Sequence, residues 1–177
     1  SLGTLFLGAQ FIDLLWPSLL LLGWERVRIE PGLTAGVPLV FEHYPISHSL
    51  LGVLLWAVGL GLVYYFFKKQ ARGAIVLGLA VLSHWVLDLI VHVPDLPLYP
   101  GESPMLGLGL WHSVGWTQVV ELGLLAIGVY FYTRTTKAVN ARGLWGFVGL
   151  IVFLLVMQVG NVMGPPPPSV TAIAWVG

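Results

Sequence analysis

The chain alternates long apolar stretches with short polar connections. Five stretches reach roughly 20 mainly apolar residues, the length that crosses about 30 Å of hydrocarbon as an α-helix. They are residues 2–22, 45–67, 73–93, 111–133 and 143–163. The pattern predicts an all-α polytopic membrane protein, a bundle of about five transmembrane helices.

Prolines mark several ends of these stretches. Pro45 suits the first turn of a helix, where its missing N–H costs nothing, and Pro94 ends the third stretch. Four consecutive prolines end helicity after the fifth, because proline lacks the donor and clashes with the preceding turn. We predict a single transmembrane helical domain over residues 1–164 and a Pro-rich extracytoplasmic tail over residues 165–177. The first stretch lacks the basic start of a secretory signal peptide, so we expect it to be retained.

Composition narrows the functional classes. The chain is 57% hydrophobic and 9% charged, whereas a soluble domain carries roughly 25% charged residues. Its net charge is zero, so it has no basic footprint for nucleic acid. It contains no cysteine, which excludes disulfides and thiolate metal sites.

Basic residues gather in two connections. Six of the eight Lys and Arg residues lie there: Lys68, Lys69, Arg72, Arg134, Lys137 and Arg142. With five spans these connections share one face of the membrane, and Lys and Arg favour the cytoplasmic face. We therefore predict a cytoplasmic N-terminus. No carboxylate or histidine lies in these two connections, so the candidate chemistry faces the extracytoplasmic side.

The third stretch carries three ionisable residues on one helical face. His84, Asp88 and His92 are spaced i, i+4, i+8. A charge near the bilayer centre costs about 2.5–3.5 kcal/mol on insertion scales, so such residues persist where they find partners inside a bundle. An imidazole and a carboxylate one turn apart suit zinc and related divalent ions.

Other readings stay open for each polar residue. Asp13 and His84 are alternatively an internal hydrogen bond that fixes helix register. His43 is alternatively a plain loop residue, and Glu121 a protonated, hydrogen-bonded acid. His92 and His112 fit either a site or a structural role. At about 1.5 Å per residue the candidates span too much depth for all of them to share one ion.

At these positions the chain resembles the bacterial membrane-bound, metal-dependent hydrolases, inner-membrane proteins once described as LexA-binding. The resemblance rests on FIDLLWP around Asp13, HYPISHSLLG from His43 to Gly52, and SHWVLD from Ser83 to Asp88. These pieces frame roughly residues 10–120. The chain departs from the family's pattern in two places: Leu14 and Leu15 follow the first Asp, where a second acid or histidine is common, and Tyr44 stands where Arg is common.

The resemblance implies a distant similarity to zinc-dependent phospholipase C. The implied function is a metal-dependent hydrolase acting near the outer leaflet of the bacterial inner membrane, on a lipid or phosphoester. The implied cofactor is a divalent metal, zinc or alternatively manganese, which lowers the pKa of water and polarises the substrate oxygen. Its ligands would be Asp13, His48, His84 and Asp88. Glu121 or Asp95 would act as general base, and His43 or His112 would orient the leaving group.

Two other classes also fit the sequence. One is a non-catalytic subunit of a larger energy-transducing or photosynthetic membrane complex, with partner membrane subunits and with histidines as pigment or haem ligands. The other is a transporter with an acidic relay, which five spans favour less.

Overall fold

The computed structural model describes residues 1–176, which form two compact units. One unit comprises Ser1–His112 and the chain from Pro167 onward, and the other comprises Ser113–Pro166. Its helices are α1 (Leu2–Ala9), α2 (Phe11–Leu21), α3 (Pro45–His48), α4 (Leu50–Lys68), α5 (Ala71–Val91), α6 (Val114–Thr135), α7 (Ala141–Met163) and α8 (Val170–Val176), with a 3-10 turn η1 (Leu110–His112). Four helices are long and apolar enough to span a membrane, and the bent pair α1–α2 makes a fifth candidate. The predicted all-α membrane bundle is confirmed.

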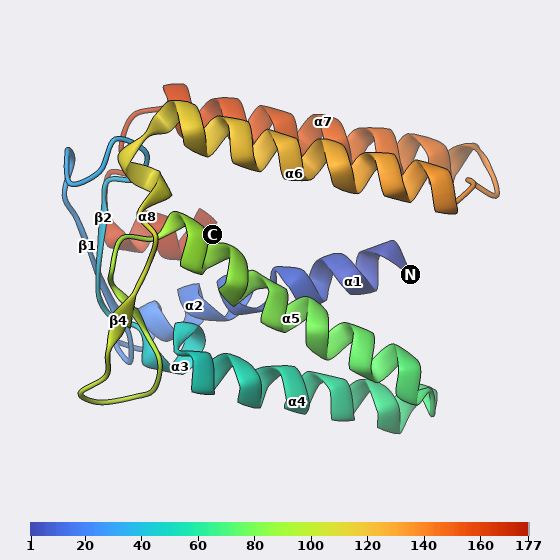
Figure 1. Cartoon of the computed structure of the whole chain (residues 1–177), viewed down its shortest axis with the longest axis horizontal. Coiled ribbons are helices and arrows are strands. Elements are labelled where there is room, and N and C mark those ends of the chain that lie inside the picture. Colours follow the sequence, from blue (N-terminus) through green and yellow to red (C-terminus); the bar gives the residue numbers. More distant parts are fainter. Residues whose placement is uncertain (177) are drawn as a thin grey trace. The chain divides into compact units, whose positions relative to one another are not determined.

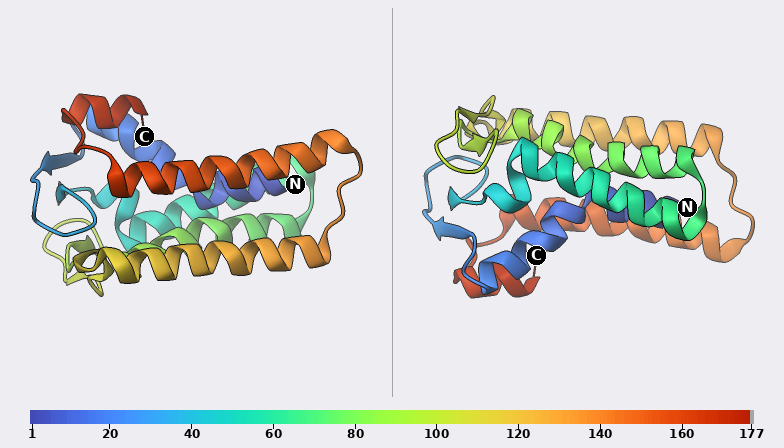
Figure 2. Two further views of the ribbon diagram at one scale, coloured as in Figure 1. Left: turned by 90° about the horizontal axis from the view of Figure 1, so that it is seen from above. Right: turned by 90° about the horizontal axis from the view of Figure 1, so that it is seen from below.

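The core of the first unit lies between α2, α4 and α5. Ile12, Val53 and Val81 are fully buried there, and Trp85 is nearly so. Helices α4 and α5 run side by side and are joined by the short connection after Lys68 (Figures 1 and 2). This pair is the scaffold on which the polar residues of the first unit are placed.

Short strands cover one end of this scaffold. β1 (Arg26–Ile29) pairs antiparallel with β2 (Leu39–His43), and β3 (Leu96–Pro97) pairs with β4 (Met105–Leu106). They lie at the end of α4 and α5 opposite the α4–α5 connection (Figures 1 and 2). The apolar pattern of the sequence does not predict these strands, because each is too short for a clear two-residue alternation.

The first stretch is bent rather than straight. α1 and α2 meet at Gln10 with an angle of 47° between them. Pro17 lies inside α2 and does not mark the break. The break ends α1 at Ala9, and the last carbonyls of a helix have no partner within the helix. The Ala9 carbonyl is therefore available to another side chain.

The second stretch also differs from the expectation, which had one helix from residue 45. Ser49 is extended (ψ 146°), so α3 is a separate turn and His48 lies on it rather than on α4. The Ser49 hydroxyl donates to the Pro45 carbonyl and accepts the Gly52 N–H, which caps α4. A Cβ at Gly52 would lie 2.7 Å from the Ile46 carbonyl oxygen, so only glycine fits this close turn.

Two further helix ends fall short of the predicted stretches. α5 ends at Val91, and His92 follows in an extended conformation. The fourth stretch begins as η1, so His112 precedes the helix α6, whose first turn is capped by the Ser113 hydroxyl. Both histidines thus belong to the short strands and turns at the end of α4 and α5 and not to the spans.

Residues 165–177, for which we predict a tail, include α8. Val170 and Ile173 pack against the core of the first unit, and Ala174 is 7% exposed. Gly177 lies outside the described residues.

The second unit is a pair of helices, α6 and α7, with its own polar contact. Gln158 on α7 donates hydrogen bonds to the side chains of Gln118 and Glu121 on α6. The rings of Tyr132 and Phe147 stack with centroids 4.6 Å apart. Glu121 is therefore hydrogen-bonded within the membrane-spanning pair.

The membrane orientation is testable with single cysteines. Ala71, beside the α4–α5 connection, and Glu102, between β3 and β4, are both exposed. We expect Ala71→Cys to be protected from an impermeant thiol reagent in intact cells and Glu102→Cys to react, because the basic connections favour the cytoplasm. Reaction of Ala71→Cys from outside would reverse the predicted orientation.

Candidate metal centre

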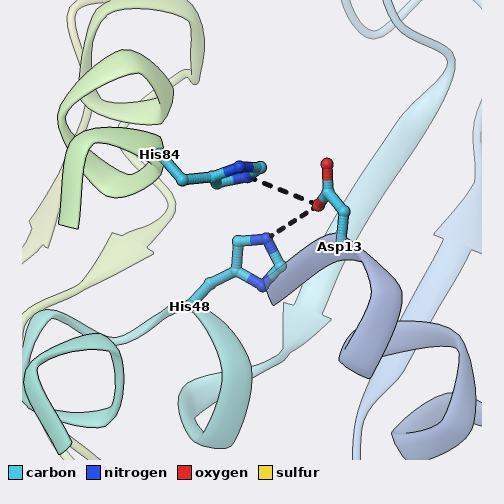
Figure 3. Close-up of side chains that lie close together, drawn as sticks. All are labelled: Asp13, His48 and His84. Atoms are coloured by element: carbon cyan, nitrogen blue, oxygen red, sulfur yellow. Dashed lines mark ion pairs between the residues drawn. The ribbon is translucent and has the colours of Figure 1, made fainter. Parts of the chain in front are cut away.

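Four predicted ligands converge from three helices of the first unit. Asp13 comes from α2, His48 from α3, and His84 and Asp88 from α5. The ligand atoms of the first three all lie within 4.8 Å of one another. Figure 3 shows both imidazoles directed at one oxygen of Asp13. Residues separated by up to 75 positions in the chain thus meet at one point.

The distances decide what kind of contact this is. Asp13 Oδ1 lies 3.4 Å from both His48 Nε2 and His84 Nε2. Asp88 Oδ2 lies 3.3 Å from His84 Nε2 and 3.9 Å from His48 Nε2. A hydrogen bond between imidazolium and carboxylate is shorter, about 2.7–2.9 Å. Metal–ligand bonds of about 2.0–2.2 Å in a tetrahedron give ligand-to-ligand distances of roughly 3.3–3.6 Å, close to those found here.

The second nitrogen of each imidazole is held away from the cluster. His84 Nδ1 lies 2.7 Å from the Ala9 carbonyl oxygen at the end of α1. A carbonyl only accepts, so Nδ1 carries a proton, and in the neutral imidazole Nε2 is then the nitrogen with a lone pair for a cation. His48 Nδ1 lies 2.6 Å from the Ser47 hydroxyl oxygen. Metal-binding histidines characteristically anchor their other nitrogen in this way.

One carboxylate oxygen in the cluster has no hydrogen-bond partner. Within residues 1–176, Asp88 Oδ2 is a buried polar atom without one, and the indole nitrogen of Trp16 is the other. An unpaired buried carboxylate oxygen is costly. A cation between Asp88 and the two imidazoles would satisfy it, so the donor set fits a divalent metal.

Aromatic residues hold His48 in place. Trp85 donates from its indole nitrogen to the His48 carbonyl (2.9 Å), and Trp56 donates to the Ile46 carbonyl (2.9 Å). The rings of Tyr44 and His48 lie 5.2 Å apart. Three side chains therefore fix the short turn α3, although it is only four residues long.

A second polar group lies beside the cluster, around His92. His92 Nδ1 lies 2.9 Å from Asp95 Oδ1, and the Tyr44 hydroxyl donates to the same oxygen at 3.2 Å. His92 is 3% exposed and packs against the ring of Trp111. Burial, with Asp95 beside the hydroxyl, raises the pKa of Tyr44 far above its ordinary value, so the phenol stays a donor. Tyr44 stands where the resembled family commonly has Arg.

The other sequence candidates are not among these four converging side chains. His43 and His112 are exposed, at the end of β2 and in η1. Glu121 is hydrogen-bonded to Gln158 in the second unit. Sequence reasoning overlooked Ser47 and Glu25, whose carboxylate accepts from the Ser47 hydroxyl at 2.6 Å. A helix start at Pro45 does call for an acceptor at its free N–H groups, but that signal does not say which acid supplies it.

Comparison with known proteins gives one family. Residues 29–162 match the family model described as YdjM inner membrane protein. The match includes His48, His84 and Asp88, and it begins after Asp13. No curated protein and no solved structure matches the chain.

Because one oxygen of Asp88 lacks a hydrogen bond, we expect Asp88→Asn to act differently on metal binding and on the stability of the metal-free protein. Asp88→Asn should abolish stoichiometric zinc or manganese binding, because it removes an anionic ligand. The metal-free variant should melt no lower than the metal-free wild type, since the amide can donate to His84 Nε2. Elemental analysis and melting curves in detergent check both. A metal held at 100 times its Kd adds about 2.7 kcal/mol, so chelation should lower the melting temperature of the wild type but not that of Asp88→Asn.

Asp95→Asn is the matched control for this variant. The Asp95 carboxylate contacts His92 and Tyr44. Among residues 1–176 it forms no ion pair with any of the four predicted ligands, so Asp95→Asn should keep its metal. Full metal retention by Asp88→Asn, or a wild-type melting curve indifferent to chelator, would reduce the cluster to a structural polar contact.

Proposed function

The chain belongs to the YdjM inner membrane protein family, a multi-pass inner-membrane family, and we propose that it is a metal-dependent hydrolase acting near the outer leaflet. The observation that carries the proposal is the meeting of two imidazole nitrogens and two carboxylate oxygens at 3.3–3.9 Å. The outward anchoring of both Nδ1 atoms supports it, because it leaves both Nε2 lone pairs for a cation.

The residues that would hold the ion are Asp13, His48, His84 and Asp88. A divalent ion such as zinc or manganese, when bound, supplies Lewis acidity toward a phosphoryl or acyl oxygen and acidifies water. The side chain of Asp13 is 49% exposed, whereas that of His48 is 5% exposed. Substrate would therefore approach on the Asp13 side, while the buried imidazoles keep the site rigid.

His92 and Asp95 would form the proton-transfer pair. The Asp95 carboxylate accepts from Nδ1–H of His92, which orients the ring and leaves Nε2 as the basic nitrogen. His92 lies one helical turn beyond Asp88, and the Tyr44 ring packs against both His48 and His92. Asp95, which the sequence nominated as a general base, would thus act through His92. Among residues 1–176, neither His43 nor His112 has a hydrogen bond or ion pair with His92 or Asp95.

The depth of the cluster supports an interfacial substrate. Asp88 and His84 precede the end of α5 at Val91 by about 4 and 10 Å, at roughly 1.5 Å per residue. Because α5 is about as long as the hydrocarbon core is thick, the cluster would lie just inside one boundary between hydrocarbon and headgroup, within reach of a membrane lipid. We therefore propose a lipid, or another phosphoester presented at the membrane surface, as the substrate class.

The alternative of a pigment- or haem-binding subunit has less support. The Nε2 atoms of His48 and His84 both lie 3.4 Å from one carboxylate oxygen. An axial ligand needs its nitrogen to face a macrocycle, and here carboxylates stand in that direction.

Turnover should depend on His92 separately from metal retention. We expect the zinc- or manganese-loaded wild type in detergent micelles to release p-nitrophenol from a chromogenic phosphodiester or phosphomonoester. His92→Ala should keep its metal, because His92 is not a ligand, and should lose about 10²–10⁴-fold in rate, the usual contribution of a proton-transfer group.

Glu42→Gln, at an exposed acid paired with Arg28, is the control, and it should leave the rate unchanged. A His92→Ala protein that loses its metal would move the site toward the membrane surface. Metal-loaded wild type inactive on phosphodiesters, phosphomonoesters and carboxyl esters alike would contradict the hydrolase proposal.

A further inference from the structure

Glu25 is a buried carboxylate without a basic partner. It is 1% exposed and lies between α2 and β1. Its Oε1 accepts the backbone N–H groups of Ile46 and Ser47, both at 2.8 Å. Its Oε2 accepts the Ser47 hydroxyl at 2.6 Å. Among residues 1–176 no Lys or Arg pairs with it, so hydrogen bonds alone hold this side chain.

The Ser47 hydroxyl connects Glu25 to His48. Its oxygen lies 2.6 Å from Glu25 Oε2 and 2.6 Å from His48 Nδ1. A hydroxyl has one hydrogen, and a carboxylate only accepts, so that hydrogen goes to Glu25. The hydroxyl oxygen then accepts from Nδ1–H of His48. The proton of the neutral imidazole is thereby placed on Nδ1, and Nε2 keeps its lone pair toward Asp13 and Asp88.

We infer that Glu25 is a positioning residue that, through Ser47, fixes the tautomer of His48 required for metal binding. The inference rests on the proposed metal site and extends it by two residues. The tautomer of the other imidazole is fixed by a different group, since His84 Nδ1 donates to the Ala9 carbonyl. A carbonyl cannot reverse its role, whereas a hydroxyl can. The tautomer of His48 therefore depends on the hydrogen-bond partner that a residue outside the cluster offers to Ser47.

This role makes a prediction that a purely structural role of Glu25 does not. In Glu25→Gln, the amide oxygen still accepts the N–H groups of Ile46 and Ser47, so α3 stays capped. The amide nitrogen takes the place of Oε2 and donates to the Ser47 oxygen. The Ser47 hydrogen then loses its acceptor at position 25 and turns to His48 Nδ1, 2.6 Å away, which moves the imidazole proton to Nε2. The near-isosteric variant thus places an N–H among the metal ligands.

The tautomer can be measured in the metal-free protein. Long-range ¹⁵N–¹H correlation spectra of ¹⁵N-histidine-labelled protein in micelles distinguish the two forms, with His48→Gln identifying the signal. We expect the Nδ1–H form in the wild type and the Nε2–H form in Glu25→Gln. Glu42→Gln is the matched control, because Glu42 is an exposed acid paired with Arg28, and it should resemble the wild type. An Nε2–H wild type, or an unchanged tautomer in Glu25→Gln, overturns the inference.

Ser47 variants provide an independent arm. Ser47→Thr keeps the hydroxyl and should keep the single Nδ1–H form, whereas Ser47→Ala should give both forms. A single Nδ1–H form in Ser47→Ala would contradict the inference, even if Glu25→Gln fails to fold.

Zinc affinity, measured by competition with a chromogenic chelator, completes the experiment. Loss of an outer partner of a metal-binding histidine typically costs 10–100-fold in affinity. We expect Glu25→Gln to lose more than Ser47→Ala, and Glu42→Gln to lose nothing. Equal affinity in Glu25→Gln and the wild type overturns the inference. A wild type that binds no zinc would instead refute the proposed function, while the tautomer spectra would still test the hydrogen-bond relay alone.

Discussion

The first unit depends on one constraint: Asp13, His48, His84 and Asp88 converge on one point, and the last three are largely buried there. Removing charged groups from water costs several kcal/mol per ion, and a membrane bundle offers little water to offset it. Hydrogen bonding would have drawn imidazole and carboxylate to about 2.7–2.9 Å, yet the four contacts lie at 3.3–3.9 Å. This spacing is the one that the proposed metal centre would require of its ligands.

The fold keeps this spacing by breaking two of its helices. The bend between α1 and α2 leaves the Ala9 carbonyl for His84. The separation of α3 from α4, which Ser49 and the close turn at Gly52 maintain, puts His48 on its own short turn. A continuous helix through Ala9 would use this carbonyl in its own hydrogen-bond ladder and leave His84 Nδ1 without it. The two breaks thus position His84 and His48 in the cluster.

Sequence reasoning recovered what depends on local periodicity. Apolar length predicted the spans, and helical spacing placed His84 and Asp88 on one face of α5. His48 was nominated through a family resemblance, and the local pattern assigned it to the wrong helix. The Glu25–Ser47 contact could not be predicted from the sequence, because 22 residues separate its partners and no periodicity links them. Contacts through turns and short strands depend on tertiary packing, which one sequence without relatives does not reveal.

The most direct test is X-ray absorption at the zinc edge of zinc-loaded, detergent-purified protein. The account predicts one zinc per chain, with two imidazole nitrogens and carboxylate oxygens at about 2.0–2.2 Å. The outer-shell scattering of two imidazole rings should be halved in His84→Ala if any zinc remains. Zinc held by oxygen alone, or the absence of stoichiometric zinc in the wild type, would contradict the claim that these four side chains form a metal centre.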